Sequence, residues 1–476
     1  CRRSFLRRLL HRLATLAVLA GAALVAQVIC TATAYAESSQ SPNIIFIMAD
    51  DLGYGDVGCY GQQQILTPSI DRLAAEGLRF TACYAGSTVC APSRCALMTG
   101  LHTGHCRVRG NARVPLEESD VTVAEVLAAA GYETAIFGKW GLGEPETTGI
   151  PNRQGFGHWF GYLNQRHAHN YYPEYLWRNT ERVSLVGNTG GRRMQYSPEL
   201  VMKATLEFLQ GDHARPFFLY LAFTLPHANN ELGRDTGNGM EIPSDAPYGD
   251  RPWPQPQKNH AAMITWLDRD VGRVLEVLEQ QGLAENTIVF FTSDNGPHRE
   301  GGADPDFFNS SGPVRGLKRD LTDGGIRVPM IVRWPGVVAA NTTSDEPWAF
   351  WDFLPTAAEL AGTTAPAKID GISMVPTLVG RQRAGREQEP HAYLYWEFHE
   401  RGFTQAVRMG QWKGLRLGPD RAVKLYDLQN DVGEAHDVAD EHPEIVKRME
   451  KILAEARTTS PHWPVKTGAR RGALLR

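Results

Sequence analysis

Four short apolar runs constrain the fold of this chain most strongly, because each one leads into polar residues suited to chemistry. The runs are uninterrupted, which is typical of strands buried on both faces of a parallel sheet. The carboxyl ends of such strands meet at one edge of the sheet, where ligands bind. We therefore expect a single functional site at that edge. The runs cover residues 43–48, 134–137, 216–223 and 287–292.

Helical segments alternate with these runs. Apolar residues at helical spacing predict helices over residues 123–130, 198–209 and 263–281, and a glycine follows each of them within two residues. Alternating strands and helices indicate an α/β fold, in which helices cover both faces of the sheet. We assign this domain to residues 42–380.

The pattern changes after about residue 380. Residues 381–390 are charged and loop-like, and an amphipathic helix is predicted over residues 443–457. Together with three short alternating runs, this helix predicts a small antiparallel sheet with one helix, a C-terminal α+β subdomain over residues 390–460. We expect it to close one side of a substrate cleft. The alternating runs cover residues 393–398, 404–409 and 412–417.

The first 36 residues have the organisation of an export signal. Four arginines among the first eight residues precede a long apolar run, and Ala34-Tyr35-Ala36 is a small-x-small cleavage signal. We expect a signal peptide over residues 1–36 and a periplasmic or secreted bacterial protein. The paired arginines resemble a twin-arginine signal, and an ordinary Sec signal is the alternative. The apolar run is borderline for a retained membrane anchor, so no stable span is expected after cleavage.

Composition limits the partners and the compartment. The length of 476 residues and hydrophobic content of 42% allow one large domain and a smaller one. The formal net charge of -4 argues against a nucleic-acid partner. Two of the seven cysteines lie in the expected signal. Apart from Cys90, an oxidising compartment permits disulfides among Cys59, Cys83, Cys95 and Cys106, and buried free thiols are the alternative.

The segment Cys90-Ala-Pro-Ser-Arg94 carries the most specific chemical signal. Pro92 suits the first turn of a helix, because its missing N–H is not needed there. A nucleophile at that helix start meets the positive end of the helix dipole, which favours an anionic adduct. Arg94, one turn on, is placed to hold the adduct. The pentapeptide resembles the C-x-P-S-R signal at which sulfatase maturation enzymes oxidise cysteine to formylglycine.

Several further motifs make the chain resemble type I sulfatases of the alkaline phosphatase superfamily, from about residue 42 to the C-terminal helix. The resemblance implies a large mixed sheet sandwiched by helices, and formylglycine made from Cys90 by a maturase. The aldehyde hydrates to a gem-diol, one oxygen of which attacks sulfur and displaces the alcohol. The second hydroxyl then restores the aldehyde and expels sulfate. Unmodified Cys90 should therefore be nearly inactive.

Two pairs of polar residues are candidate metal ligands. Asp50-Asp51 and Asp294-Asn295 each follow an apolar run. Singly, such a pair is more often a helix cap or turn, but both match the family's four protein ligands for a divalent metal. Hard oxygen ligands suit calcium or magnesium. The resemblance implies one calcium ion, with residue 90 as a further ligand.

Three basic residues match the family's sulfate-handling groups. Lys139 in Gly-Lys-Trp and Lys318 in Gly-Leu-Lys correspond to the two lysines that bind the sulfuryl oxygens. His227 in Leu-Pro-His corresponds to the leaving-group histidine, which suits general-acid work near neutral pH.

One position departs from the family's pattern. Many sulfatases read Gly-Lys-Trp-His, where the histidine is thought to assist the gem-diol, but this chain has Gly141 at that place. Glycine cannot act as a base, so the role is either vacant or filled from elsewhere. His102, His105 and His298 lie in motif-rich loops and are the candidates.

The substrate-facing residues are predicted from composition. Residues 166–173 and 175–177 concentrate aromatics, histidines and an arginine in one expected loop, which suits contact with sugars; an ordinary packed loop is the alternative. Residues 229–257 are expected to form another wall. The predicted function is hydrolysis of a sulfate ester on a sulfated carbohydrate or small molecule. The alternatives are a phosphonate monoester or phosphodiester hydrolase of the same superfamily and an inactive sulfoglycan-binding protein.

Overall fold

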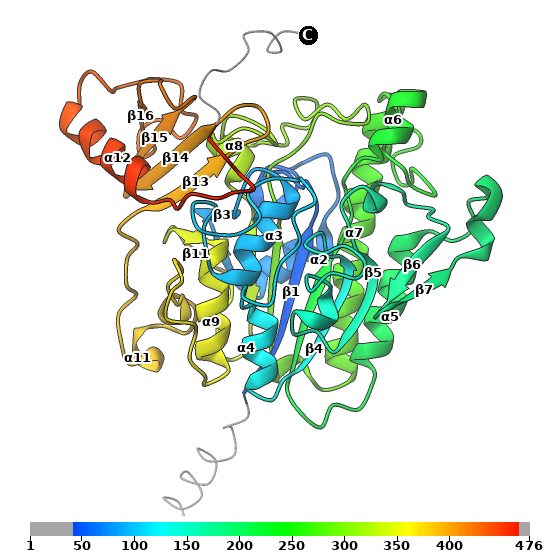
Figure 1. Ribbon diagram of the computed structural model, residues 1–476. Coiled ribbons are helices and arrows are strands. Elements are labelled where there is room, and N and C mark those ends of the chain that lie inside the picture. Colours follow the sequence, from blue (N-terminus) through cyan, green and yellow to red (C-terminus); the bar gives the residue numbers. More distant parts are fainter. Residues whose placement is uncertain (1–40, 466–476) are drawn as a thin grey trace, which may run out of the picture. The chain divides into compact units, whose positions relative to one another are not determined.

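The four apolar runs form the centre of a large sheet, whose strands are β1 (Asn43–Ala49), β4 (Glu133–Lys139), β8 (Phe217–Ala222) and β9 (Thr287–Ser293). They lie side by side in the order β9-β1-β8-β4, and every neighbouring pair is parallel. The expectation of a parallel, doubly buried core is therefore confirmed. The computed structural model describes residues 41–465 (Figure 1), so the expected signal over residues 1–36 lies outside the described residues.

Shorter strands extend this centre into a mixed sheet of ten strands within residues 41–465. On one side β9 pairs antiparallel with β10, and on the other β4 pairs parallel with β5. An antiparallel hairpin continues from β5, so residues 175–177, expected in a loop, belong to a strand that is paired on both sides. The added strands are β10 (Met330–Arg333), β2 (Leu78–Phe80), β11 (Thr342–Ser344), β5 (His158–Tyr162), β6 (Tyr175–Arg178) and β7 (Glu181–Ser184).

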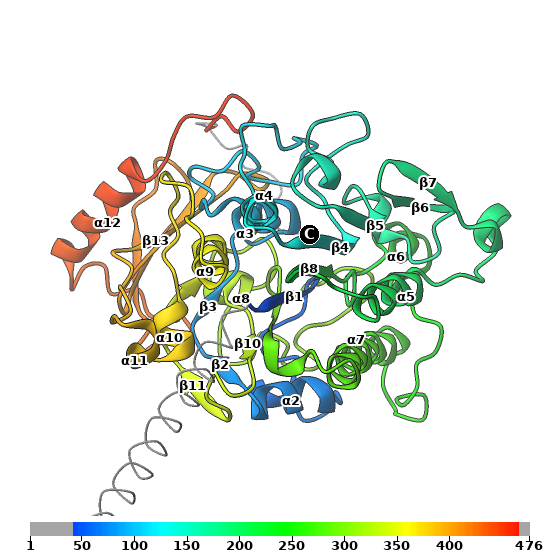
Figure 2. The same ribbon diagram turned by 90° about the horizontal axis from the view of Figure 1, so that it is seen from below.

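Helices cover both faces of the sheet, as Figure 2 shows. Successive side chains of a strand point to opposite faces, so Ile45 and Ile47 pack into one core while Ile44 and Phe46 pack into the other. The first core is closed by α2 (Pro68–Ala75), α5 (Ser197–Leu209) and α7 (Gln255–Gln280). The second core is closed by α3 (Cys90–Thr99), α4 (Val123–Ala129) and α9 (Phe353–Leu360).

Two helices differ from the sequence prediction. The helix expected over residues 263–281 is α7, which begins earlier, at Gln255, because its first turns are polar and carry no apolar stripe. The segment 229–257, expected as a loop, contains α6 (Asn230–Thr236), a helix with no buried residue. Hydrophobic periodicity cannot detect such a helix. By contrast, α4 and α5 match the predicted ranges closely.

The C-terminal part contains the predicted antiparallel sheet and helix. Its strands are β13 (Leu394–Phe398), β14 (Thr404–Met409), β15 (Trp412–Arg416) and β16 (Lys424–Asp427), and its helix is α12 (Pro443–Glu455). The fourth strand was not predicted. The charged stretch after residue 380 is not only loop, because it begins with α11 (Arg381–Ala384), preceded by α10 (Val375–Val379). The domain boundaries stay a prediction.

This sheet lies beside the main domain (Figure 1), and buried polar contacts join the two. Lys413 Nζ on β15 lies 2.6 Å from Asp323 Oδ1 and 3.0 Å from a Glu434 carboxylate oxygen. Asp323 begins α8 (Asp323–Ile326), shortly after Lys318 in the chain. Next to it, β3 (Cys83–Tyr84) and β12 (Trp348–Ala349) form a small parallel pair. The C-terminal sheet thus supports the segment that carries a predicted sulfate-binding lysine.

Two further expectations concern disulfides and membrane-spanning helices. Within residues 41–465 the thiols of Cys59, Cys83, Cys90, Cys95 and Cys106 are all free. The disulfides that an oxidising compartment permits are therefore not formed in this structure, and the free-thiol alternative describes it. In the same part of the chain, no helix is both long and apolar enough to cross a membrane.

Candidate active site

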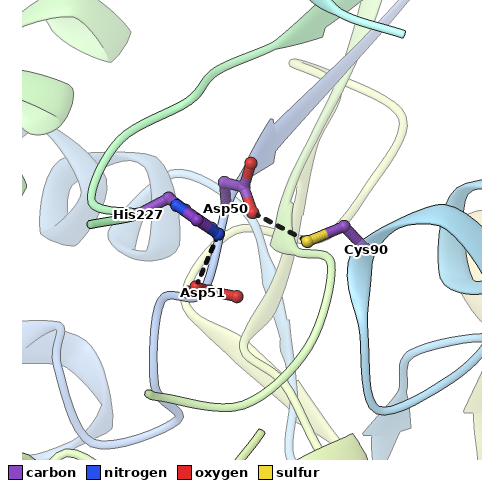
Figure 3. Close-up of side chains that lie close together, drawn as sticks. All are labelled: Asp50, Asp51, Cys90 and His227. Carbon is purple, nitrogen blue, oxygen red and sulfur yellow. Dashed lines mark hydrogen bonds and ion pairs between the residues drawn. The ribbon is translucent and has the colours of Figure 1, made fainter. Parts of the chain in front are cut away.

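The polar residues after the four central strands meet at one edge of the sheet, as the sequence predicts. Asp50 follows β1, Asp294 follows β9, Lys139 ends β4, and His227 lies in the loop after β8. The ligand atoms of Asp50, Asp51, Cys90 and His227 all lie within 4.8 Å of one another. Figure 3 shows these side chains converging from three different segments.

Cys90 is the first residue of α3 and is only 2% exposed. Its thiol donates to Asp50 Oδ1 over 3.4 Å, and the next backbone N–H donates to Asn111 Oδ1 over 3.0 Å. Burial, together with the charge of Asp50, raises the pKa of this thiol well above its ordinary value. Because the thiolate is the nucleophilic form of cysteine, unmodified Cys90 is a poor nucleophile here.

Two buried lysines neutralise the paired aspartates. Lys139 Nζ lies 2.6 Å from Asp50 Oδ2, and Lys318 Nζ lies 2.8 Å from Asp51 Oδ2. Burial alone would raise the pKa of each carboxyl, but these cations hold both values well below the ordinary range. Asp51 has a φ of +67°, a left-handed conformation that is uncommon outside glycine and marks functional sites. Both carboxylates are therefore ionised and fixed in place.

The pair after β9 completes the acidic cluster. Asp294 Oδ1 accepts from the Asp51 backbone N–H over 3.1 Å, and Asn295 Nδ2 donates to Asp51 Oδ1 over 2.7 Å. Burial and the charge of Asp50 raise the pKa of Asp294 to about 7. An additional cation near Asp294 would favour its ionised form.

Arg94 lies in the first turns of α3, as expected. Its guanidinium lies 2.9 Å from Asp294 Oδ2 and donates to the Lys139 carbonyl over 2.6 Å. It is fully buried, so it orients Asp294 and the end of β4. Its role in holding an adduct on residue 90 stays a prediction.

The acidic cluster fits a hard divalent cation. Asp50 and Asp51 bring carboxylate oxygens within 4.8 Å of one another, and Asp294 and Asn295 both contact Asp51. Oxygen ligands of this kind suit calcium or magnesium. Asn295 Oδ1 is buried and has no hydrogen-bond partner within residues 41–465, which leaves one oxygen free for an ion. The residues predicted as ligands are thus brought together, and their role as ligands stays a prediction.

His227 and Lys318 form a second polar group on the other side of Asp51. His227 Nδ1 donates to the Ala228 carbonyl over 2.7 Å, so Nε2 accepts from Lys318 Nζ over 3.1 Å. Burial and the charge of Lys318 lower the pKa of His227 to about 3, so the imidazole is neutral at pH 7. Glu300 also binds Lys318, over 3.0 Å. The sequence prediction missed Glu300, although it lies only six residues after Asp294.

The three candidate histidines do not fill the place of the side chain missing at residue 141. His102 and His105 stack on one another, and His105 Nδ1 lies 2.9 Å from Asp370. His298 lies 3.4 Å from the Pro226 carbonyl. Within residues 41–465 none of the three makes a hydrogen bond to Cys90. The neighbour of Gly141 is instead Gln165, which no sequence signal indicated.

A cleft opens above Cys90. Its volume is about 400 Å³, and its lining includes Cys90, His227 and Lys318. A neighbouring cavity of about 700 Å³ shares Arg166 and other residues with it and adds tyrosines from the segment predicted to face substrate. Residues 166–173 therefore line both hollows. The segment 229–257 also contributes to the walls, as predicted.

Cys90, His227 and Lys318 line the cleft, and the acidic cluster with Lys139 lies buried beside them. On an alkaline phosphatase-like fold, this arrangement defines a hydrolase of anionic esters. A family model described as Sulfatase matches residues 42–363. A second, described as N-sulphoglucosamine sulphohydrolase, C-terminal, matches residues 317–459. The chain belongs to the sulfatase family and is a sulfuric ester hydrolase.

Individual relatives agree with this assignment. The chain is 34% identical to the N-acetylgalactosamine-6-sulfatase of Mus musculus over 414 residues, covering 79% of this chain and 72% of that protein. It is 29% identical to the N-acetylgalactosamine-6-O-sulfatase of Bacteroides thetaiotaomicron, covering 89% of this chain and 94% of that protein. The solved structure of Ps i-CgsB in complex with k-i-k-neocarrahexaose has a TM-score of 0.74 at 29% identity, covering 90% of this chain and 96% of that one.

Proposed function

We propose that the protein removes sulfate from a sulfated carbohydrate, using formylglycine made from Cys90 and one bound calcium ion. The observation that carries this proposal is the position of Cys90, which lies buried in the lining of the cleft, contacts Asp50 and shares that lining with Lys318. A thiol with a strongly raised pKa has no evident use at such a place. Its conversion to an aldehyde hydrate would supply both an attacking oxygen and the second hydroxyl needed to expel sulfate.

The two lysines bind the sulfuryl group in this proposal. Lys318 lines the cleft, and Lys139 lies beneath it against Asp50. Fixed cations at such positions stabilise the charge of a sulfate ester as its S–O bond breaks. Asp50, Asp51, Asp294 and Asn295 would hold the calcium ion, which would add positive charge beside the attacking group.

His227 serves the leaving group together with Lys318. Its Nε2 is unprotonated and accepts from the Lys318 ammonium group over 3.1 Å. We therefore assign the proton that reaches the bridging oxygen of the ester to the Lys318–His227 pair, of which Lys318 is the protonated member. Glu300, 3.0 Å from Lys318, keeps that lysine charged. This arrangement assigns the general-acid role to the pair rather than to the histidine alone.

A carbohydrate substrate is supported by the relatives and by the cleft. The two named relatives are N-acetylgalactosamine-6-sulfatases, and the solved structure of Ps i-CgsB holds k-i-k-neocarrahexaose. Amides, histidines and tyrosines line the two cavities, and such groups suit sugar hydroxyls. Export through the segment 1–36 would place the enzyme outside the cytoplasm, where such glycans are found.

Sulfate release and mass spectrometry test the proposal together. The protein is produced with a formylglycine-generating enzyme and assayed on N-acetylgalactosamine 6-sulfate, galactose 6-sulfate and 4-nitrophenyl sulfate, with a phosphonate monoester in parallel. We expect sulfate release and a mass of the Cys90 peptide that corresponds to formylglycine. Cys90→Ala should lose activity and keep its fold, and Cys59→Ala is the matched thiol control. Preferential phosphonate cleavage would favour the hydrolase alternative. No turnover of any substrate would favour the binding protein.

A further inference from the structure

The backbone at Gly141 excludes a side chain. Its φ of +83° is strained for any residue with a Cβ, and a Cβ built there would lie 2.1 Å from Gln165 Nε2. The space beside residue 141 is thus occupied by the amide of Gln165, which follows β5 and reaches across from a different segment. Gly141 and Gln165 both line the cleft above Cys90.

The Gln165 amide has no partner in the protein. Neither Nε2 nor Oε1 finds a hydrogen-bond partner within residues 41–465, although both atoms are shielded from solvent. A buried polar group left in this state lowers stability. Unpaired buried groups of this kind are explained either by strain or by a ligand that completes them. The cleft beside Gln165 supplies room for a ligand.

A second amide in the same cleft shares this property. Asn230, at the start of α6, also lines the cleft, and its Oδ1 is buried without a partner among the described residues. Its backbone carbonyl accepts from Arg234, whereas the side-chain oxygen has no such partner among the described residues. Two unpaired amides from distant segments therefore line one cleft, together with Cys90 and Lys318.

We propose that Gln165 and Asn230 are specificity-determining residues that bind a neutral substituent of the sulfated sugar. The substituent both donates and accepts hydrogen bonds, so it is a hydroxyl or an acetamido group of the sugar that carries the sulfate ester. This inference rests on the proposed function, because the sugar must lie in the cleft for its sulfur to meet residue 90.

The chemistry of an amide decides what it binds. A primary amide carries two N–H donors and a carbonyl acceptor but no charge and no basic atom. Gln165 therefore cannot act as the base that a histidine at residue 141 would supply. Under the proposed function, the gem-diol oxygen on residue 90 is activated by other groups. A partner that offers both a donor and an acceptor satisfies Nε2 and Oε1 together, whereas a sulfate oxygen satisfies only the donor. Selectivity follows, because a substrate lacking that partner leaves the amide unpaired.

The test compares sugar and aryl substrates in Gln165→Leu. We expect kcat/KM to fall roughly 10- to 100-fold on the sugar sulfates. The fall on 4-nitrophenyl sulfate, whose ring offers no combined donor and acceptor, should be at least tenfold smaller. A hydroxyl partner predicts equal losses on galactose 6-sulfate and N-acetylgalactosamine 6-sulfate, and an acetamido partner predicts a loss on the second alone. Asn230→Ala should likewise lower kcat/KM more on the sugar sulfates than on 4-nitrophenyl sulfate.

Stability separates recognition from a structural role. Because the amide is unpaired in the free protein, Gln165→Leu should melt at the wild-type temperature or above it. Gln429→Leu, at an exposed position outside the cleft, is the matched control. It should change neither kcat/KM nor the melting temperature. Equal losses on all three substrates, no loss on any, or a lowered melting temperature would overturn the proposal. Wild-type protein that releases no sulfate from any substrate would instead remove the proposed function beneath it.

Discussion

Asp56 should make the stability of the folded protein depend on pH. It lies in the loop after the two candidate ligands that follow β1 and is fully buried. Its Oδ2 accepts from the Gly53 backbone N–H over 2.7 Å, while Oδ1 has no partner within residues 41–465. Burial raises the pKa of Asp56 from 3.8 to about 6. The ionised carboxylate is thus the form that the folded protein disfavours.

The sign and size of this pH effect on the unfolding free energy follow from the difference between the folded and unfolded pKa values of Asp56. A folded-state pKa above the unfolded value gives a stabilisation that is fully present below pH 4 and lost as pH rises through 6. A shift of this size corresponds to about 3 kcal/mol of unfolding free energy. Asp56→Asn keeps the acceptor for Gly53 but does not titrate. The variant should therefore gain about 3 kcal/mol relative to wild type between pH 4 and pH 8.

Urea unfolding of wild type and of Asp56→Asn across this pH range, in the presence of a metal chelator, measures the difference in their unfolding free energies. Other titrating groups contribute equally to both proteins and cancel. An unpaired amide N–H in the variant adds only an offset that does not change with pH. Asp250→Asn, at an exposed position, is the control and should give a flat difference. A flat difference for Asp56→Asn would refute the reasoning and show that Asp56 is ionised at little cost.

Three further predictions concern the site. Asp294→Ala should lose bound calcium and activity together, and calcium titration showing wild-type affinity would rule Asp294 out as a ligand. Lys139→Ala and Lys318→Ala should each lower kcat/KM by about two orders of magnitude or more; steady-state assays that find less than a tenfold loss would contradict their role. Gly141→Ala should destabilise the fold, through the clash with Gln165 Nε2 at 2.1 Å and the φ of +83°. In a Gln165→Ala background only the backbone cost should remain, about 1 kcal/mol; equal costs in both backgrounds would show that the two residues do not interact.

The elements that the sequence predicted best are those whose structure is determined by a single physical rule. The four buried strands had no alternative to a parallel sheet covered on both faces, so their polar ends had to meet at one edge. The helix start at Cys90 followed in the same way from Pro92 and the apolar residues after it. These predictions depend on local pattern and on topology, both of which the sequence carries directly.

The missed features depend on contacts between distant segments. Gln165 follows β5, and nothing in its surroundings indicates that it meets Gly141 at the end of β4. Arg94 was placed on the correct helix, but its contact with the buried Asp294 carboxylate was not predicted. A short strand such as β16, with four residues, is too brief to show a period. Side-chain direction and the pairing of remote loops are set by packing, which a single sequence does not reveal.

The burial of Cys90 constrains when the proposed conversion of its thiol could occur relative to folding. All ten residues of α3 are buried, so the finished protein exposes no peptide segment around Cys90 for a second enzyme to take into its own catalytic centre. The proposed conversion of the thiol would therefore have to precede the packing of α3 against the sheet. A chain that folded first would keep its unmodified thiol until it unfolded again. Under the proposed function, the yield of active enzyme would depend on the relative rates of maturation and folding, and a variant that folds more slowly should be matured more completely.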